Sequence, residues 1–362
     1  MVFSQKHTHI AKGIAILLLL YYHMFIDYGD FRGFLALIAH SCVYVFVFLS
    51  GLGLTISFDK ASSSNTKALS WIAKHIWKLE VFFWPHFLIG TLIYTIICKG
   101  SILAFYGNMG NLLLDFFCIS DMVGGKHLLG VWWYMGLAIF IVLVLVLFAK
   151  AFGKIGWYII PVTYALMLII PNLFGKDAYD NPGPYKGYLL AVCLGVIFAR
   201  KKLFEKYMDF LKRRSVLMNV ILSAGCLTAV VVLTILLPLT RWNHIAEFLL
   251  LPQLVKTAVA ILFVFFGLNL AELSIVSHSL EFLGKMSDDM FIIHIAIRVA
   301  FPPVTKMTAI PEVNYLIFLA AGIILTMAYK GIKSISKYDV LMEKAFSMMN
   351  RGNMPKPKSV EK

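Results

Sequence analysis

Two side chains able to do chemistry lie near the ends of the first apolar segment. Lys12 precedes a run of mainly aliphatic residues, and His23 follows it. In an α-helix this spacing corresponds to about 16 Å along the axis and only about 20° around it, so both side chains share one stripe. Ionisable groups within a membrane are costly unless they face protein or water, so the pattern indicates a site inside a helix bundle. The alternative is that Lys12 extends to one membrane interface and His23 hydrogen-bonds at the other.

Two further residues extend this candidate catalytic site. Asp27 lies four residues after His23, one helical turn further on, where a carboxylate would orient the imidazole and stabilise its protonated form. The alternative is that Asp27 only begins a polar rim with Tyr28 and Asp30. His294 is a second histidine within a later apolar segment. Such a residue either takes part in catalysis or hydrogen-bonds to a neighbouring helix.

A pair of lysines lies where the third apolar segment begins. Lys74 and Lys78 are four residues apart and therefore share one helical face. Two neighbouring ammonium groups suit a polyanion such as the phosphates of a nucleotide cofactor. The alternative is that lysines gather at any cytoplasmic flank of a membrane protein. Pro85 follows within the segment and should kink the helix where a ligand enters.

Aromatic residues mark the start of the fourth apolar segment. Trp132 and Trp133 follow a glycine-rich loop, residues 124–127. This pair is a candidate for substrate binding, and the alternative is that it belongs to the aromatic belt at the membrane interface. We expect the loops 124–127 and 177–184 to face the substrate on the outer side, because they are long and rich in Gly, Pro and aromatic residues.

Composition shows which elements must position these residues. Hydrophobic residues make up 60% of the 362 residues, charged residues make up 14%, and the mean hydropathy is +0.81. These values lie outside the range of soluble domains and indicate an all-α, polytopic transmembrane helix bundle. Apolar runs of sufficient length predict about ten spans. We place them at 10–28, 35–57, 79–98, 128–149, 156–173, 185–199, 216–237, 251–272, 280–300 and 313–330.

The charge distribution predicts the orientation. There are 33 Lys and Arg residues against 19 Asp and Glu, and most of the basic ones flank one side of the expected spans. The positive-inside rule then places both termini in the cytoplasm, and no nucleic acid is needed to explain the basic charge. Residues 1–335 form the expected membrane domain, and 336–362 form a basic cytoplasmic tail whose end we expect to be disordered. Residues 102–118 are expected to form a re-entrant or interfacial segment.

The five cysteines predict no metal site. None of them forms a Cys-x-x-Cys pair, and most lie in apolar segments, as small core residues do. We therefore expect no bound metal.

These motifs together resemble acyltransferase family 3, the integral-membrane O-acyltransferases of bacteria and some eukaryotes. The first span of that family typically reads Arg-Gly-x-Ala, then an apolar run, then His, at the spacing of Lys12 and His23 here. Its second span carries a Phe-x-Leu-Ser-Gly pattern, similar to the residues from Phe46 to Gly51 that include Ser50. The resemblance covers nearly the whole chain.

The later motifs follow in the order typical of that family. Two basic residues spaced by four and followed by a proline resemble Lys74, Lys78 and Pro85. An aromatic start to the fourth span and a late Gly-x-x-Ser before His294 complete the likeness. This chain has Lys at three basic positions where the family usually has Arg, and lysine lacks the bidentate guanidinium fork.

The resemblance implies a membrane O-acyltransferase in the cytoplasmic membrane of a bacterial cell. Its donor would be a cytoplasmic acyl-CoA, commonly acetyl-CoA, and its acceptor a hydroxyl of a surface glycan or lipid-linked glycan such as capsule, O-antigen or exopolysaccharide. Lys12, Lys74 and Lys78 would hold the donor, Ser50 would contact substrate, and His23 would act in catalysis. Imidazole can accept a proton from a sugar hydroxyl or carry the acyl group itself, and both mechanisms stay open.

Two other functions fit parts of the pattern. A transporter or a polysaccharide-export component would also contain many spans and intramembrane histidines, but it predicts related halves with paired broken helices, and the sequence has no convincing internal repeat. In a non-catalytic membrane partner, the polar residues would only hold helices together.

Overall fold

The computed structural model describes residues 3–61, 65–170, 185–241, 250–271 and 273–351, and in these residues every regular element is a helix. The α-helices are α1 (Gln5–Phe25), α2 (Phe31–Ala39), α3 (Cys42–Ala61), α4 (Asn65–Leu92), α5 (Ile102–Tyr106), α6 (Met109–Phe116), α7 (Trp133–Ile155), α8 (Ile159–Ile169), α9 (Leu189–Lys201), α10 (Leu203–Leu211), α11 (Val216–Arg241), α13 (Leu251–Leu270), α14 (Ser274–Ala300), α15 (Pro311–Ile335) and α16 (Tyr338–Arg351). Short helical pieces η1 (Ile93–Ile97), η2 (Asp121–Val123), η3 (Gly156–Tyr158), η5 (Tyr185–Tyr188) and η6 (Pro302–Lys306) lie between them.

Seven segments in the described part of the chain are long and apolar enough to cross a membrane. The protein is therefore an all-α, multi-pass membrane protein, as predicted. The segments are Gln5–Phe25, Phe31–Ala61, Lys67–Ile97, Trp133–Ile169, Val216–Ile235, Leu251–Leu270 and Pro311–Ile335. The count of about ten spans and the cytoplasmic placement of both termini stay predictions.

The difference between seven and ten has local causes. The predicted spans 128–149 and 156–173 fall largely within one candidate segment, in which α7 ends at Ile155 and α8 begins at Ile159. The predicted span 185–199 is mostly α9, which has 13 residues and is shorter than a typical membrane span. The predicted span 280–300 lies in α14, whose middle carries the charged residues Glu281, Lys285, Asp288 and Asp289.

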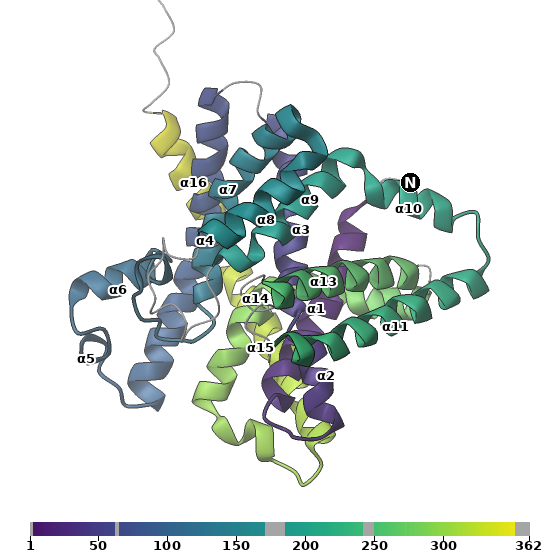
Figure 1. The fold of residues 1–362 in the computed structure, drawn as a ribbon. Coiled ribbons are helices and arrows are strands. Elements are labelled where there is room, and N and C mark those ends of the chain that lie inside the picture. The colour runs from purple at the N-terminus through teal and green to yellow at the C-terminus, as the bar shows by residue number, and fades with distance from the viewer. Residues whose placement is uncertain (1–2, 62–64, 171–184, 242–249, 272, 352–362) are drawn as a thin grey trace, which may run out of the picture.

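The closest helix contact in the bundle joins α1 and α14. A β-carbon added to Gly284 would lie 1.8 Å from the carbonyl oxygen of His9, and one added to Gly13 would lie 2.1 Å from that of Leu280. Side chains at these two positions would therefore overlap with the opposite backbone. Glycine allows the two helix axes to approach closely, as small residues do in membrane helix pairs. We call this contact the α1–α14 interface, and Figure 1 shows α1 in the centre of the molecule beside α14, α15 and α3.

A backbone carbonyl that Pro85 leaves free in α4 binds the last described helix, α16. Pro85 lies inside α4 and has no N–H, so the carbonyl of Val81 loses its usual helical donor. The hydroxyl of Tyr338 donates to that carbonyl at 3.0 Å. Residues 338–351 of the predicted tail thus form α16, which packs on α4 and α15 (Figure 1); residues 352–362 lie outside the described part of the chain.

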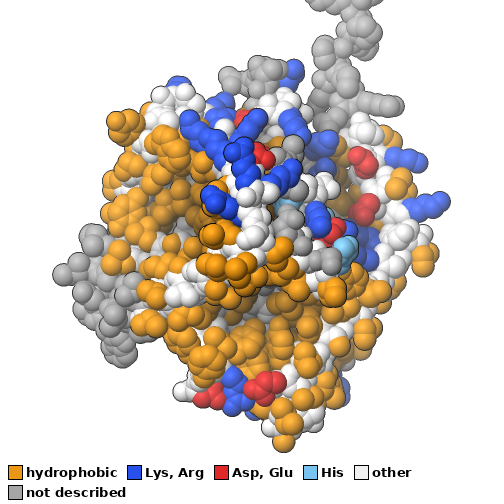
Figure 2. Space-filling view, turned by 90° about the vertical axis from the view of Figure 1, so that its right-hand side faces the viewer, with side chains coloured by type: hydrophobic (Ala, Val, Ile, Leu, Met, Phe, Trp, Pro, Cys, Tyr) orange, Lys and Arg blue, Asp and Glu red, His pale blue; other side chains and the backbone are white. Residues whose placement is uncertain are grey.

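The surface has the polarity expected of a membrane protein. Figure 2 shows hydrophobic side chains over a broad area and most Lys and Arg side chains gathered above it, with a small charged group at the opposite end. At least one ion-pair network lies on the outer side of the predicted topology, where Arg32 binds Asp30 at 2.6 Å and Glu312 at 3.3 Å. In the segment 102–118, the chain forms α5 and α6, two short helices that expose Leu103, Met109, Leu113 and Phe117.

Candidate active site

The structure brings together two histidines that are far apart in the sequence. The rings of His23 on α1 and His294 on α14 lie 5.0 Å apart between centroids. His294 is fully buried, and its Nδ1 lies 3.3 Å from the carbonyl oxygen of Met290. A carbonyl only accepts, so Nδ1 carries the proton and Nε2 presents a lone pair. Within the described residues, that Nε2 has no hydrogen-bond partner, so the pair offers an imidazole nitrogen able to take a proton.

Lys12 lies at the other end of the same helix stripe. Its Nζ contacts both carboxylate oxygens of Asp288 at 2.9 and 3.0 Å, and the Asp288 side chain is 60% exposed. An ion pair that is so exposed contributes little to stability. An anionic ligand can therefore replace Asp288 as the partner of Lys12 at small cost.

A central cavity of about 220 Å³ lies at the Lys12 end of the site. Its lining includes Lys12, Ser50, Tyr134, Asp288 and Phe291. The Phe291 ring packs on Tyr134 at 4.5 Å and on His294 at 6.2 Å. Phe291 therefore lies between the central cavity and the histidine pair.

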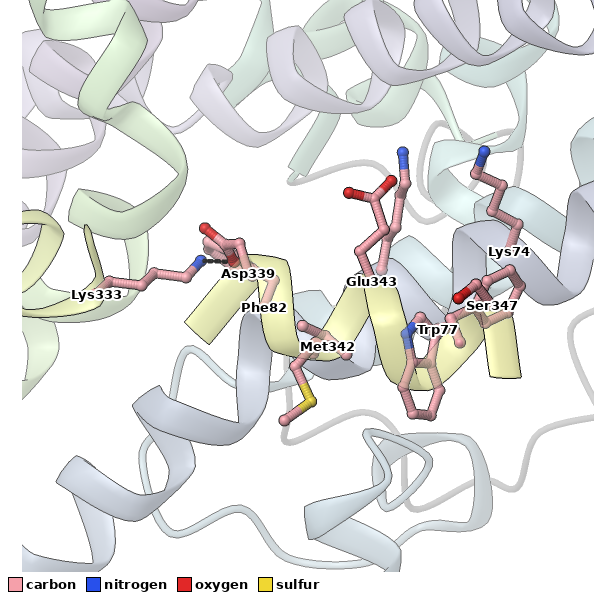
Figure 3. A pocket seen from close by; sticks show the side chains of 11 residues that line it. Lys74, Trp77, Phe82, Lys333, Asp339, Met342, Glu343 and Ser347 are labelled. Atoms are coloured by element: carbon pink, nitrogen blue, oxygen red, sulfur yellow. Dashed lines mark ion pairs between the residues drawn. The ribbon is translucent and has the colours of Figure 1, made fainter. Parts of the chain in front are cut away.

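The predicted donor-binding lysines line a second and larger space. Lys74 and Lys78 belong to a cavity of about 560 Å³ between α4 and α16, which we call the α4–α16 cavity. Figure 3 shows Lys74 and Lys333 at opposite ends of this cavity, with α16 lying across it. Trp77 and Phe346 add an aromatic wall, with ring centroids 5.8 Å apart. The cavity thus combines cations with flat apolar surfaces.

A third cavity adds lysines that sequence reasoning did not assign to a site. It measures about 540 Å³, and its lining includes Lys285, Lys330, Lys333 and Lys337. We call it the lysine cavity. Lys330 and Lys333 lie three residues apart on α15. This spacing places both on one helical face, so the sequence could have indicated a second basic site here.

The three cavities are neighbours, because Phe82 lines all of them. Lys333 and Asp339 are shared by the α4–α16 cavity and the lysine cavity, and they form an ion pair at 2.9 Å. Asp288 is shared by the lysine cavity and the central cavity. A series of spaces therefore leads from the lysines on α4 and α15 to Lys12.

A buried network of side chains lies beside this series of cavities and was not predicted from the sequence. The side-chain nitrogen Nε2 of His86 lies 3.5 Å from Oδ1 of Asp289, and Nζ of Lys330 lies 3.5 Å from Oδ2 of the same carboxylate. His86 is also fixed through Nδ1, which donates to the carbonyl of Phe82 at 2.9 Å. The network ties α4, α14 and α15 together at the wall of the lysine cavity.

Three other predicted residues lie apart from the histidine pair. Helix α1 ends at Phe25, so Asp27 falls outside it and is exposed. No contact between Asp27 and His23 occurs among the interactions of the described residues. Trp132 packs against Phe83 and Phe87, with both ring centroids at 5.1 Å, so it is part of the core.

Trp133 is also buried, with its ring 6.0 Å from that of Tyr188. The next residue, Tyr134, lines the central cavity instead. Tyr134 is therefore the residue of the aromatic motif 132–134 that lines the central cavity. The predicted substrate-facing loop 177–184 lies outside the described residues.

The other such loop, 124–127, is fixed by a buried carboxylate. Asp115 accepts a hydrogen bond from the Tyr106 hydroxyl and another from the Leu128 N–H at 3.1 Å. Nδ1 of His127 lies 2.6 Å from Asp115, and Nε2 lies 3.5 Å from Asp121. Burial opposes the charge on His127, but the hydrogen bonds to Asp115 and Asp121 outweigh it and raise the pKa of His127 to about 9. The loop is therefore held by a protonated histidine between two carboxylates.

Fold and site together define a multi-pass membrane protein with a histidine pair and a set of cavities lined by lysines. The sequence model of acyltransferase family 3, an acyltransferase domain, matches residues 9–329, nearly the whole chain, and the chain belongs to this family. No curated protein and no solved structure matches it significantly. In the described residues no cluster of three or more His, Cys, Asp or Glu side chains has the arrangement of a metal site.

Proposed function

We propose that this protein is a membrane O-acyltransferase that moves an acetyl group from cytoplasmic acetyl-CoA to a hydroxyl of a bacterial surface polysaccharide or its lipid-linked precursor. The observation that carries the proposal is the series of cavities from Lys74 and Lys78 to Lys12, with the His23 and His294 rings beyond Phe291. Membership of an acyltransferase family supports the reaction class.

The donor would occupy the cavities in a fixed direction. Lys74, Lys78 and Lys333 are suited to the phosphates of the nucleotide, because each ammonium group donates charge-assisted hydrogen bonds. Trp77 and Phe346 supply flat faces for an adenine ring. The acyl-bearing arm would then extend past Phe82 into the central cavity.

Transfer to the acceptor breaks one bond and forms another. His23 accepts the proton of the acceptor hydroxyl as its oxygen attacks the thioester carbonyl. The carbon–oxygen bond forms, the carbon–sulfur bond breaks, and the proton passes to the leaving thiolate, so free CoA is released. General-base catalysis requires the neutral imidazole, and the ring of His294 lies beside that of His23 at 5.0 Å between centroids.

The test is the acetyl content of surface polysaccharide in a strain that lacks the gene. We expect wild type to restore the O-acetyl signals in proton NMR, and His23→Ala at equal membrane abundance to lower them by about 100-fold or more. His278→Ala, on an exposed turn of α14, is the matched control and should restore them. Signals that do not depend on the gene would argue against acetyl transfer.

A further inference from the structure

A fourth cavity lies at the end of α14 beyond the histidines. It measures about 520 Å³ and is lined by Arg298, Pro302, Pro303 and Lys306. Arg298 follows His294 by four residues, about one helical turn, on α14. We call this space the outer cavity. It lies at the end of α14 that is away from Lys285 and Asp288, which line the lysine cavity.

The wall of the outer cavity is stiff. Helix α14 ends at Ala300, and Pro302 and Pro303 open the short helix η6, which ends at Lys306. Each proline fixes its own φ angle, so the backbone between the two cations has little freedom. Arg298 and Lys306 thus line one recess together.

The two cations of this cavity have no acidic partner. Within the described residues, neither Arg298 nor Lys306 forms an ion pair, and the nearby acids Asp30 and Glu312 both bind Arg32. Two inner cations are paired, because Lys12 binds Asp288 and Lys333 binds Asp339. Lys74 and Lys78, which we assign to the donor phosphates, resemble Arg298 and Lys306 in having no ion pair within the described residues.

The position of Arg298 in the last turn of α14 has a simple partial explanation. A cation there stabilises the partial negative charge of a helix C-terminus. That explanation does not account for Lys306, which lies beyond α14 at the end of η6 and also lines the cavity. Cations are also disfavoured on the outer side of a membrane protein, so two of them at one recess require a partner.

Resting on the proposed function, we propose that the acceptor is an acidic glycan, and that Arg298 and Lys306 bind its carboxylate or phosphate group in the outer cavity. Arginine can engage either anion with two parallel hydrogen bonds. Because Arg298 lies one turn from His294, an anion bound there would leave a neighbouring sugar hydroxyl close to the histidine pair. The charge on the acceptor would then select the substrate.

The test uses acceptors that differ only in charge. Full-length protein in nanodiscs of zwitterionic lipid would receive acetyl-CoA and matched glycan pairs, and kcat/KM for the acceptor would be measured. One set is glucuronate-containing oligosaccharides and their methyl amides, and the other is phosphorylated oligosaccharides and their dephosphorylated forms. We expect the acidic member of a pair to be preferred by at least about 10-fold, with the preference falling at high salt. The set that shows the preference identifies the anion.

Variants connect the preference to the outer cavity. Arg298→Gln and Lys306→Gln should each lower kcat/KM for the acidic acceptor by about 10- to 100-fold, without changing kcat/KM for the neutral one or the KM for acetyl-CoA. Lys99→Gln, at an exposed cation outside the cavity, is the control and should behave as wild type. If Arg298→Gln does not fold, Lys306→Gln gives the answer, because Lys306 lies beyond the end of α14.

Three results would overturn the inference. Equal transfer to both members of every pair would show that charge does not select the acceptor, while leaving acyl transfer intact. A variant effect that appears only when anionic phosphatidylglycerol is added to the nanodiscs would assign the cations to lipid headgroups. Absence of transfer to any glycan would instead overturn the proposed function, and this inference with it.

Discussion

The α1–α14 interface and the α4–α16 cavity are built in opposite ways. In the first, Gly13 and Gly284 bring two backbones together and place the histidine pair between them. In the second, α16 lies across a space of about 560 Å³ and is attached partly by the Tyr338 hydrogen bond. The proposed function therefore places the histidine pair in the closely packed part of the bundle and the donor lysines beside an open space.

The largest expected effect comes from forcing the α1–α14 interface apart. Gly284→Leu places side-chain atoms where the His9 carbonyl lies, so the helices must separate, at a cost of about 3 kcal/mol or more. We expect a clear fall in thermal stability in detergent and loss of acyl transfer. Gly225→Ala is the control, because nothing lies within 4 Å of an added β-carbon there. A Gly284→Leu protein as stable as wild type would mean that this contact is not tight.

The next effect concerns the loop around His127, a third region that is fixed by charge and not by packing. Burial opposes the charge on His127, but hydrogen bonds to Asp115 and Asp121 raise its pKa from 6.5 to about 9, which corresponds to about 3 kcal/mol of stabilisation. A raised pKa stabilises the fold fully below pH 6.5, and the stabilisation is lost as pH rises through about 9.

Thermal melts at pH 6.5 and pH 9.5 check this prediction. The melting temperature of wild type should fall between the two values, and that of His127→Gln should change much less. Equal pH dependence in both proteins would place the titrating group elsewhere. If the His127 loop and the α4–α16 cavity are independent, the His127→Gln substitution should leave the KM for acetyl-CoA unchanged at both pH values.

A smaller effect is expected from the lysines of the α4–α16 cavity. Lys78→Gln removes a cation from the cavity and should raise the KM for acetyl-CoA by about 10-fold with kcat nearly unchanged, because a phosphate contact acts equally before and during transfer. Lys150→Gln, an exposed lysine at the end of α7, serves as the control. A fall in kcat with an unchanged KM would instead place Lys78 in the reaction step.

The smallest effect tests the attachment of α16. Tyr338→Phe removes one hydrogen bond to the Val81 carbonyl, worth about 1 kcal/mol. We expect faster proteolysis between α15 and α16 and a donor KM raised by about 2- to 5-fold, with an unchanged melting temperature. If Tyr338→Phe also lowered the melting temperature by the amount expected for about 1 kcal/mol, α16 would unfold together with the rest of the bundle. The contrast between the two regions would then be wrong.

Part of the fold and part of the candidate site were predictable from the sequence. Membership in the family and the all-α membrane fold followed from apolar runs and motif order, and the helical period correctly placed Lys74 and Lys78 in one cavity. The proximity of His23 and His294 was not predictable, because it depends on two glycines that bring α1 and α14 together. Periodicity within one segment carries no information about its neighbours.

Asp27 illustrates a different limit. Its predicted place above His23 assumed that the helix continues, but α1 ends at Phe25. The chain turns there because Asp30 caps the next helix, accepting a hydrogen bond from the Arg32 N–H at 2.9 Å. Asp at such a position is a helix-start signal, and it outweighs the hydrophobic period that precedes it.

Pro85 has a consequence for how the protein is made. The Val81 carbonyl that Pro85 leaves free is bonded by Tyr338, and residues from 338 onward are the last of the described chain to leave the ribosome. The wall of the α4–α16 cavity therefore closes only after every other described helix has been synthesised. Under the proposed function, a nascent chain would carry its histidine pair before its donor cavity was complete, so an unfinished product would bind acetyl-CoA poorly.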